Sequence, residues 1–266
     1  GGGMAVNLTL GVSLKMYFGY AQTLDWSRQV AEIVRQHPLL KAYPQTTLFT
    51  FPSAPVIDGT LGAFAGTAMQ VGAQNIAPAA PGAWTGETSA AMVAEMGGRF
   101  VEIGHAERRR HFHEDDAVIC RKVQLALENG LTPVICIGEP QQLPVADATD
   151  FAIQEANLII HFLQQHGLSG DLIFAWEPQW AIGAPQPASA EYIQSVCAGL
   201  RSYLSTVAGH HRVIYGGSAG PGLLSELWPD VDGLFLGRFA HQPAAIAAIL
   251  DEAYTLLTRS ETKEHL

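Results

Sequence analysis

Three side chains with complementary acid–base chemistry, Lys15, His105 and Glu177, each stand directly after a short apolar segment of the 266-residue chain. The segments are LTLGVSL (8–14), RFVEIG (99–104) and DLIFAW (171–176). A lysine supplies a positive charge, a histidine an electrophile and a carboxylate a base. If one end of the fold gathers all three, the set can carry out acid–base catalysis in a single pocket.

Two glycine-containing turns accompany these residues, GGSAG (216–220) and LGR (236–238). Glycine lets backbone N–H groups approach an anion closely, so adjacent turns of this kind can hold a phosphate group. Taken singly, each is better interpreted as an ordinary turn; it is the two together, after adjacent strands, that favour a phosphate site.

The elements that must position these groups alternate along the chain. Eight short, nearly continuous apolar runs read as buried parallel strands. They are residues 8–14, 46–51, 68–73, 99–104, 132–138, 171–176, 212–217 and 233–237. Segments with helical periodicity lie between and after them, at residues 25–37 (with Asp25 as N-cap), 88–98, 117–130, 151–167, 188–207 and 242–257.

Eight alternations without a linker predict an α/β protein built as a single (β/α)8 barrel. An open sheet with a dinucleotide site is disfavoured, because neither GxGxxG nor a Walker phosphate loop is present. Functional groups of such a barrel lie at the carboxyl ends of the strands. We assign residues 4–266 to this one domain, and Gly1 to Gly3 to an expression-vector remnant.

Composition narrows the class of protein further. Hydrophobic residues make up 48% and the formal net charge is −10, which disfavours nucleic-acid and membrane-surface binding. The three cysteines (Cys120, Cys136 and Cys197) form no CxxC pair, so we expect no disulfide and no zinc site. No apolar run is long enough for a membrane helix, and no basic segment precedes the first apolar residues as in a signal peptide. We therefore expect a soluble, cytoplasmic protein.

Several motifs also resemble those of the triosephosphate isomerase family, in order and with the family's spacing over residues 11–243. They are GAWTGETSAAM (82–92), EIGHAERR (102–109), PVICIGE (133–139), FAWEPQWAIG (174–183) and IYGGSAG (214–220). The resemblance implies a (β/α)8 barrel in carbohydrate metabolism (glycolysis and gluconeogenesis). It implies interconversion of an aldose phosphate and a ketose phosphate through an enediolate, with a small phosphorylated sugar as substrate. No cofactor and no metal are expected.

The resemblance also assigns roles to the three side chains. Glu177 would take a proton from the carbon next to the carbonyl, with its pKa raised by an apolar frame of Trp176 and Pro178. His105 would polarise the carbonyl and stay neutral at the start of a helix. Lys15 would supply positive charge, with Glu107 as its supporting ion-pair partner. At an arbitrary strand end, a carboxylate that caps the next helix would be about as good an interpretation of Glu177. For a lone histidine, a capping or core role is usually the better interpretation, but Glu107 and Arg108 after His105 argue against it.

Backbone N–H groups of Gly183, Ser218, Gly237 and Arg238 are the candidates for holding the phosphate. Residues 178–187, with a proline at each end, would form a mobile lid that excludes water from the intermediate.

Some positions depart from the family pattern, and all lie around the expected substrate. Ser13 replaces an asparagine that helps to position the substrate, and Arg238 replaces a glycine. Gln179 replaces an apolar residue of the lid, whose far hinge also differs. The triose phosphate is the first expectation for the substrate. The alternative is a four-carbon ketose phosphate of the L-erythrulose 1-phosphate type, and a non-catalytic sugar-phosphate-binding barrel is a third reading.

Residues 74–87 form an unusually apolar segment that includes Ile76, Ala77 and Trp84. An exposed apolar loop favours self-association. In the resembling family this loop docks into a second subunit, and the position of Thr85 reaches the neighbouring active site. We expect a homodimer, although the loop could instead fold onto its own barrel.

Overall fold

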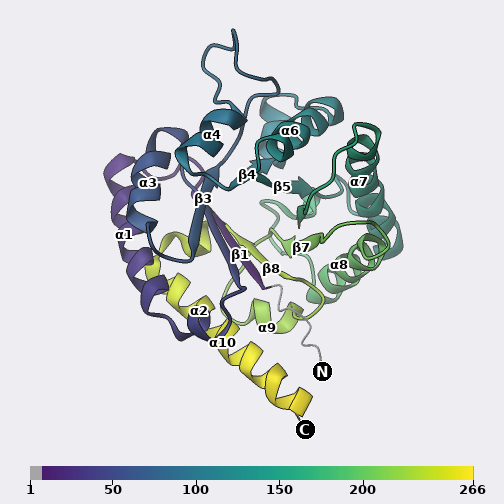
Figure 1. The fold of residues 1–266 in the computed structure, drawn as a ribbon. Helices are drawn as coiled ribbons and strands as arrows, with labels where there is room; N and C mark the ends of the chain where they lie inside the picture. The colour runs from purple at the N-terminus through teal and green to yellow at the C-terminus, as the bar shows by residue number, and fades with distance from the viewer. Residues whose placement is uncertain (1–7, 266) are drawn as a thin grey trace.

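A computed structural model describes residues 8–265, and its centre is a closed barrel of eight parallel strands ringed by helices (Figure 1). The strands pair in sequence order, and β1 closes the ring against β8. They are β1 (Thr9–Ser13), β2 (Thr47–Phe51), β3 (Met69–Ala73), β4 (Phe100–Ile103), β5 (Thr132–Ile137), β6 (Ile173–Trp176), β7 (Arg212–Tyr215) and β8 (Gly233–Leu236). All eight predicted strands and the predicted (β/α)8 barrel are confirmed. The assignment of Gly1 to Gly3 lies outside the described residues.

Ten α-helices lie in the described part of the chain. They are α1 (Tyr20–Gln36), α2 (Pro38–Ala42), α3 (Ile57–Phe64), α4 (Ala90–Met96), α5 (Ala106–His111), α6 (Asp116–Glu128), α7 (Val145–Gln165), α8 (Ala190–Leu204), α9 (Leu223–Leu227) and α10 (Pro243–His265). Short 3₁₀ turns are η1 (Ala54–Val56), η2 (Gln179–Ala181) and η3 (Arg238–His241). Among these helices, none is long and apolar enough to cross a membrane.

Three predicted helix boundaries are wrong. Helix α1 begins at Tyr20 after Gly19, so Asp25 is an interior residue that accepts a hydrogen bond from Gln29 rather than the N-cap. Helix α7 begins at Val145 rather than at residue 151, directly after Pro144, where the fixed φ of proline suits a helix start. Helix α10 continues past residue 257 to His265.

Alternation along each strand divides the apolar residues into two layers. One layer faces the helices, and the other fills the barrel. The inner layer consists of Phe49, Phe51, Phe100, Val134, Ile173, Ala175, Ile214 and Phe235. Its aromatic rings are in contact, for example Phe49 stacked on Phe100 with centroids 4.9 Å apart. The barrel interior is therefore a packed core rather than a channel.

Two glycines make this tight interior possible. A Cβ on Gly11 would lie 2.2 Å from the ring of Phe49, so only glycine leaves room for that ring. At Gly233, where β8 meets β1, φ is +157° and a Cβ would lie 1.6 Å from the carbonyl oxygen of Thr9. Closure of the barrel between β8 and β1 thus requires glycine at this position.

Candidate active site

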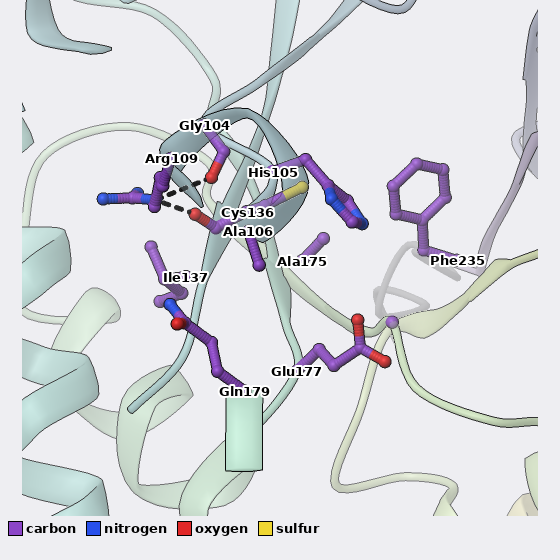
Figure 2. A pocket seen from close by; sticks show the side chains of 11 residues that line it. Gly104, His105, Ala106, Arg109, Cys136, Ile137, Ala175, Glu177, Gln179 and Phe235 are labelled. Atoms are coloured by element: carbon purple, nitrogen blue, oxygen red, sulfur yellow. Dashed lines mark hydrogen bonds between the residues drawn. The ribbon is translucent and has the colours of Figure 1, made fainter. Parts of the chain in front are cut away.

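The structure brings Lys15, His105 and Glu177 to one end of the barrel, as predicted. Each stands at the carboxyl end of its strand, β1, β4 or β6. His105 and Glu177 line a narrow pocket of about 20 Å³, which Figure 2 shows from close by. Lys15 and His105 line a larger cavity of about 600 Å³. Because His105 lines both, the two cavities adjoin at this residue, and we treat them together as the candidate site.

His105 is the N-cap of α5, and its Nδ1 accepts a hydrogen bond from the backbone N–H of Glu107 at 3.0 Å. Its side chain is 17% exposed. Burial lowers the pKa of His105 to about 4. The charge of Lys15 also lowers this pKa, whereas the charge of Glu107 opposes the shift. The expected neutral imidazole is therefore favoured, but mainly by burial and cationic neighbours rather than by the helix start alone.

Glu177 follows β6 and shares the pocket with Cys136, Gly216 and Phe235. Burial raises the pKa of this carboxyl to about 7, which suits a base that must both take and return a proton. In Figure 2 the carboxylate and the His105 ring project toward the same space from two different strands.

The apolar frame of Glu177 differs from the prediction. Trp176 is fully buried, but it packs in the layer outside the barrel beside Tyr192 and Tyr215. Consecutive residues of a strand point to opposite faces, so Trp176 and Glu177 cannot share the pocket. Burial of Glu177 comes instead from inward-facing groups such as Phe235 and Cys136.

Lys15 has its Nζ atom 2.6 Å from Oε1 of Glu107, which forms the expected ion pair. Burial alone would lower the pKa of Lys15, but the hydrogen bond and charge of Glu107 raise it overall, so the side chain stays protonated. Lys15 has a positive φ of 50°, and its carbonyl oxygen accepts hydrogen bonds from Gln74 Nε2 (2.9 Å) and Ser53 Oγ (3.2 Å). This unusual backbone conformation is thus held from two neighbouring strand ends.

The predicted phosphate ligands lie after three adjacent strands, β6, β7 and β8, but they do not line either cavity. Gly183, Ser218 and Arg238 are exposed, and Gly237 is half-buried. The guanidinium carbon of Arg238 lies 5.1 Å from the ring centroid of Tyr17, a cation–π arrangement that holds the charge beside the end of β1.

The predicted lid begins on a firmly anchored turn. Glu139 accepts hydrogen bonds at its backbone oxygen from the N–H of Gln179 (2.9 Å) and at Oε2 from Trp180 Nε1 (3.1 Å). Beyond this turn residues 182–187 are exposed, including the apolar side chain of Ile182 at 45%. Gln179 lines the narrow pocket, whereas residues 182–187 are not among its lining residues.

Several residues that shape the site were not predicted from the sequence. Glu102 is a buried carboxyl on β4, Gln74 secures the end of β1, and Glu139 anchors the lid. The run RFVEIG indicates that Glu102 lies in a strand. The two-residue period of a strand places Glu102 on the same face as Phe100, but only the structure shows that this face is inside the barrel.

The loop of residues 74–87 is only partly as expected. Ile76 and Ala77 are 0% and 3% exposed and pack against their own barrel, which corrects the expectation that they are free. Residues 81–87 are exposed, Trp84 is 50% exposed, and the loop projects beyond the helices beside α4 (Figure 1).

Comparison with known proteins agrees with this geometry. A family model described as triosephosphate isomerase matches residues 8–253. An L-erythrulose-1-phosphate isomerase of Pectobacterium atrosepticum is 52% identical over 95% of this chain and 98% of its own length. A second protein of that name, from Mesorhizobium japonicum, is 36% identical over 94% and 98%. A probable triosephosphate isomerase 2 of Listeria monocytogenes is 35% identical over 91% and 95%.

The matched region spans the whole barrel and includes all three strand-end residues, Lys15, His105 and Glu177. These findings make the chain an isomerase of the aldose–ketose type. It belongs to the triosephosphate isomerase family.

Proposed function

We propose that this protein isomerises a four-carbon ketose phosphate of the L-erythrulose 1-phosphate type. The reaction is supported by one geometric observation, the meeting of His105 and Glu177 in a single pocket. The choice of substrate is supported by the relative of that name at 52% identity, against 35% for the triosephosphate isomerase relative. Glyceraldehyde 3-phosphate is the second candidate substrate, because the matching family model carries the triosephosphate isomerase description.

The proposed reaction begins at the hydroxyl-bearing carbon next to the substrate carbonyl. Glu177 removes the proton from that carbon, and the electron pair of the C–H bond forms a carbon–carbon double bond. The carbonyl oxygen thereby becomes the oxygen of an enediolate. A base with a pKa of about 7 is half ionised at neutral pH and returns the proton readily.

His105 and Lys15 stabilise the charge that develops on oxygen. With Nδ1 engaged by the N–H of Glu107, a neutral His105 carries its proton on Nε2, the nitrogen free to face a substrate oxygen. Lys15 adds a full positive charge. His105 passes its proton to one oxygen and receives the proton of the other, and Glu177 then protonates the former carbonyl carbon. The carbonyl has moved by one carbon, with no net change in atoms or electrons.

The phosphate group would bind where the loops after β6, β7 and β8 meet. Gly183, Ser218 and Gly237 offer backbone N–H groups, and Arg238 offers a charge. Since the first of these is on the exposed lid, we propose that closure of residues 178–187 completes the phosphate site and excludes water.

Incubation of the protein with L-erythrulose 1-phosphate in D₂O tests the reaction. Proton NMR should show deuterium entering the carbon that was the carbonyl, together with a new tetrulose phosphate. A matched incubation with glyceraldehyde 3-phosphate ranks the two candidates. Absence of deuterium incorporation in both would contradict an isomerase acting on either sugar.

We also propose that the protein is a homodimer, with the loop of residues 74–87 of one protomer docked on the other. Large apolar side chains are exposed around the cavity mouth, Met16 at 90% and Phe112 at 63%, and Trp84 is exposed on the loop itself. In such a dimer Thr85 would approach the neighbouring site. Sedimentation of the wild type should give twice the mass of a Trp84→Asp variant, and a monomeric wild type would contradict the proposal.

A further inference from the structure

Two polar side chains at the inner end of the larger cavity have no role in the reaction described above. Ser13 on β1 and Glu102 on β4 are each 4% exposed. Both line the cavity together with Lys15 and His105. Glu102 shares the inward face of β4 with Phe100, so it is a carboxyl group at the upper edge of an otherwise apolar barrel interior.

These two side chains are poorly partnered within residues 8–265. The Ser13 hydroxyl is fully buried and forms no hydrogen bond, although it lies near enough to lower the pKa of Glu102. The contacts of Glu102 are weak: the thiol of Cys136 donates to it across 3.8 Å, and the Ser13 hydroxyl and the Lys15 charge each lower its pKa. Lys15 is not its ion-pair partner, because the ammonium group is bonded to Glu107.

A buried hydroxyl without a hydrogen bond and a buried carboxyl with only weak donors are costly, so whatever fills the cavity is expected to supply hydrogen bonds to them. A phosphate would be repelled by the carboxyl. A metal ion is not the expected occupant either, because the described residues include no cluster of three or more His, Cys, Asp or Glu side chains that could hold one. A neutral hydroxyl group fits both atoms, because it can donate to a carboxylate and accept from a serine.

We propose that Ser13 and Glu102 form a hydroxyl-binding subsite that selects sugar phosphates carrying a hydroxyl at this point. Glu102 accepts the hydroxyl hydrogen, and Ser13 donates to the hydroxyl oxygen. The inference rests on the proposed function, which places the reacting carbons beside His105. A tetrulose phosphate has one more hydroxyl group than a triose phosphate. A ligand that lacks the hydroxyl leaves both protein groups unpaired, a strong source of discrimination.

Binding of two unreactive ligands tests the subsite without requiring turnover. Phosphoglycolate has a phosphate and a carboxylate but no free hydroxyl group. 4-Phosphoerythronate has the same two end groups with hydroxyl-bearing carbons between them. Isothermal titration calorimetry should show that Glu102→Leu weakens binding of 4-phosphoerythronate by about 10- to 100-fold, the range for hydrogen bonds to a charged group. Binding of phosphoglycolate should not change. Glu102→Gln, which keeps an accepting oxygen, should recover part of the loss.

Equal weakening of both ligands by Glu102→Leu would mean a structural role and would overturn the proposal, as would no change for either. Ser13→Ala removes a single hydroxyl and serves as the second variant if Glu102→Leu fails to fold. It too should weaken binding of 4-phosphoerythronate and leave binding of phosphoglycolate unchanged. In kinetic assays the ratio of kcat/KM for tetrulose over triose phosphate should fall in the same variants. If the wild type converts triose phosphate alone, the proposed function fails, while the binding experiment still decides whether the subsite exists.

Discussion

The backbone N–H of Glu107 donates a hydrogen bond to Nδ1 of His105 across 3.0 Å, while the side chain of the same glutamate bonds Lys15 at 2.6 Å. Glu107 thereby connects two of the three predicted catalytic residues. The first bond requires an unprotonated Nδ1, and the second holds the lysine charge beside the imidazole. One residue at the start of α5 thus determines both the tautomer of His105 and the position of Lys15.

This relationship predicts that His105 stays neutral, with its proton on Nε2, throughout the physiological range. Burial lowers the pKa of the imidazole to about 4, so protonation is expected only below about pH 5. Long-range ¹H–¹⁵N NMR spectra between pH 5 and 9 check this. The signals are assigned by their loss in His105→Asn. A midpoint near 6.5, the value of an unperturbed histidine, would contradict the prediction.

The raised pKa of Glu177 predicts an acid limb in the pH profile. The base must be ionised to act, so kcat/KM should rise about tenfold per pH unit below about pH 7 and level off above it. Burial also raises the pKa of Glu102 to about 7, so a control is needed. The acid limb should persist in Glu102→Gln. If it disappears in that variant, the group that titrates is Glu102 and not Glu177.

Arg238 predicts a binding effect distinct from catalysis. Arg238→Ala removes the charge stacked on Tyr17 and should raise KM by about 10-fold or more, with a small change in kcat. Steady-state kinetics provide both parameters, and Arg35→Ala, on the exposed face of α1, serves as an arginine control far from the loops. A loss confined to kcat would show that Arg238 does not bind the phosphate group.

A buried ion-pair network supports the loop that carries His105. Glu114 Oε2 lies 2.6 Å from Lys122 Nζ and 2.7 Å from Arg108 Nε, and the side chains of Glu114 and Lys122 are about 5% and 3% exposed. Lys122→Met should lower the free energy of unfolding by about 1.5–3 kcal/mol, the range for a hydrogen bond to a charged group, because Glu114 loses one partner and keeps Arg108.

The matched control for that substitution is Arg35→Met, which breaks the exposed pair with Glu32 and should cost about 1 kcal/mol or less. Urea unfolding at neutral pH measures both variants. Similar losses for the two would show that burial of the Glu114 network adds nothing. The lowered pKa of Glu114 implies that this stabilisation is present above the unfolded-state pKa of a glutamate and is lost as the pH falls through the folded-state pKa.

The positions of the strand-end residues could be predicted from the sequence because each follows an apolar run directly. A parallel barrel leaves its strand ends on one side, so identifying the runs was sufficient to bring Lys15, His105 and Glu177 together. The contact between His105 and Glu107 also had a local signal in the sequence, since Glu107 follows His105 by two residues at the start of a helix.

Other features depend on packing that a continuous apolar run does not reveal. In such a run both faces are buried, so the sequence alone did not show that Trp176 faces the helices while Glu102 faces the barrel interior. Helix α3 was missed because Gly59 and Gly62 weaken its helical signal. The burial of Ile76 depends on contacts with the neighbouring barrel core, which no local pattern in the loop records.

The most direct test of the proposed function compares kcat/KM for L-erythrulose 1-phosphate and for glyceraldehyde 3-phosphate, measured on the purified protein and on Glu177→Gln. We expect the tetrulose phosphate to be the better substrate, and both activities to fall by about 10²- to 10⁴-fold in the variant, the usual contribution of a general base. A higher kcat/KM for glyceraldehyde 3-phosphate would contradict the proposed substrate, and activity that survives in Glu177→Gln would contradict the proposed mechanism.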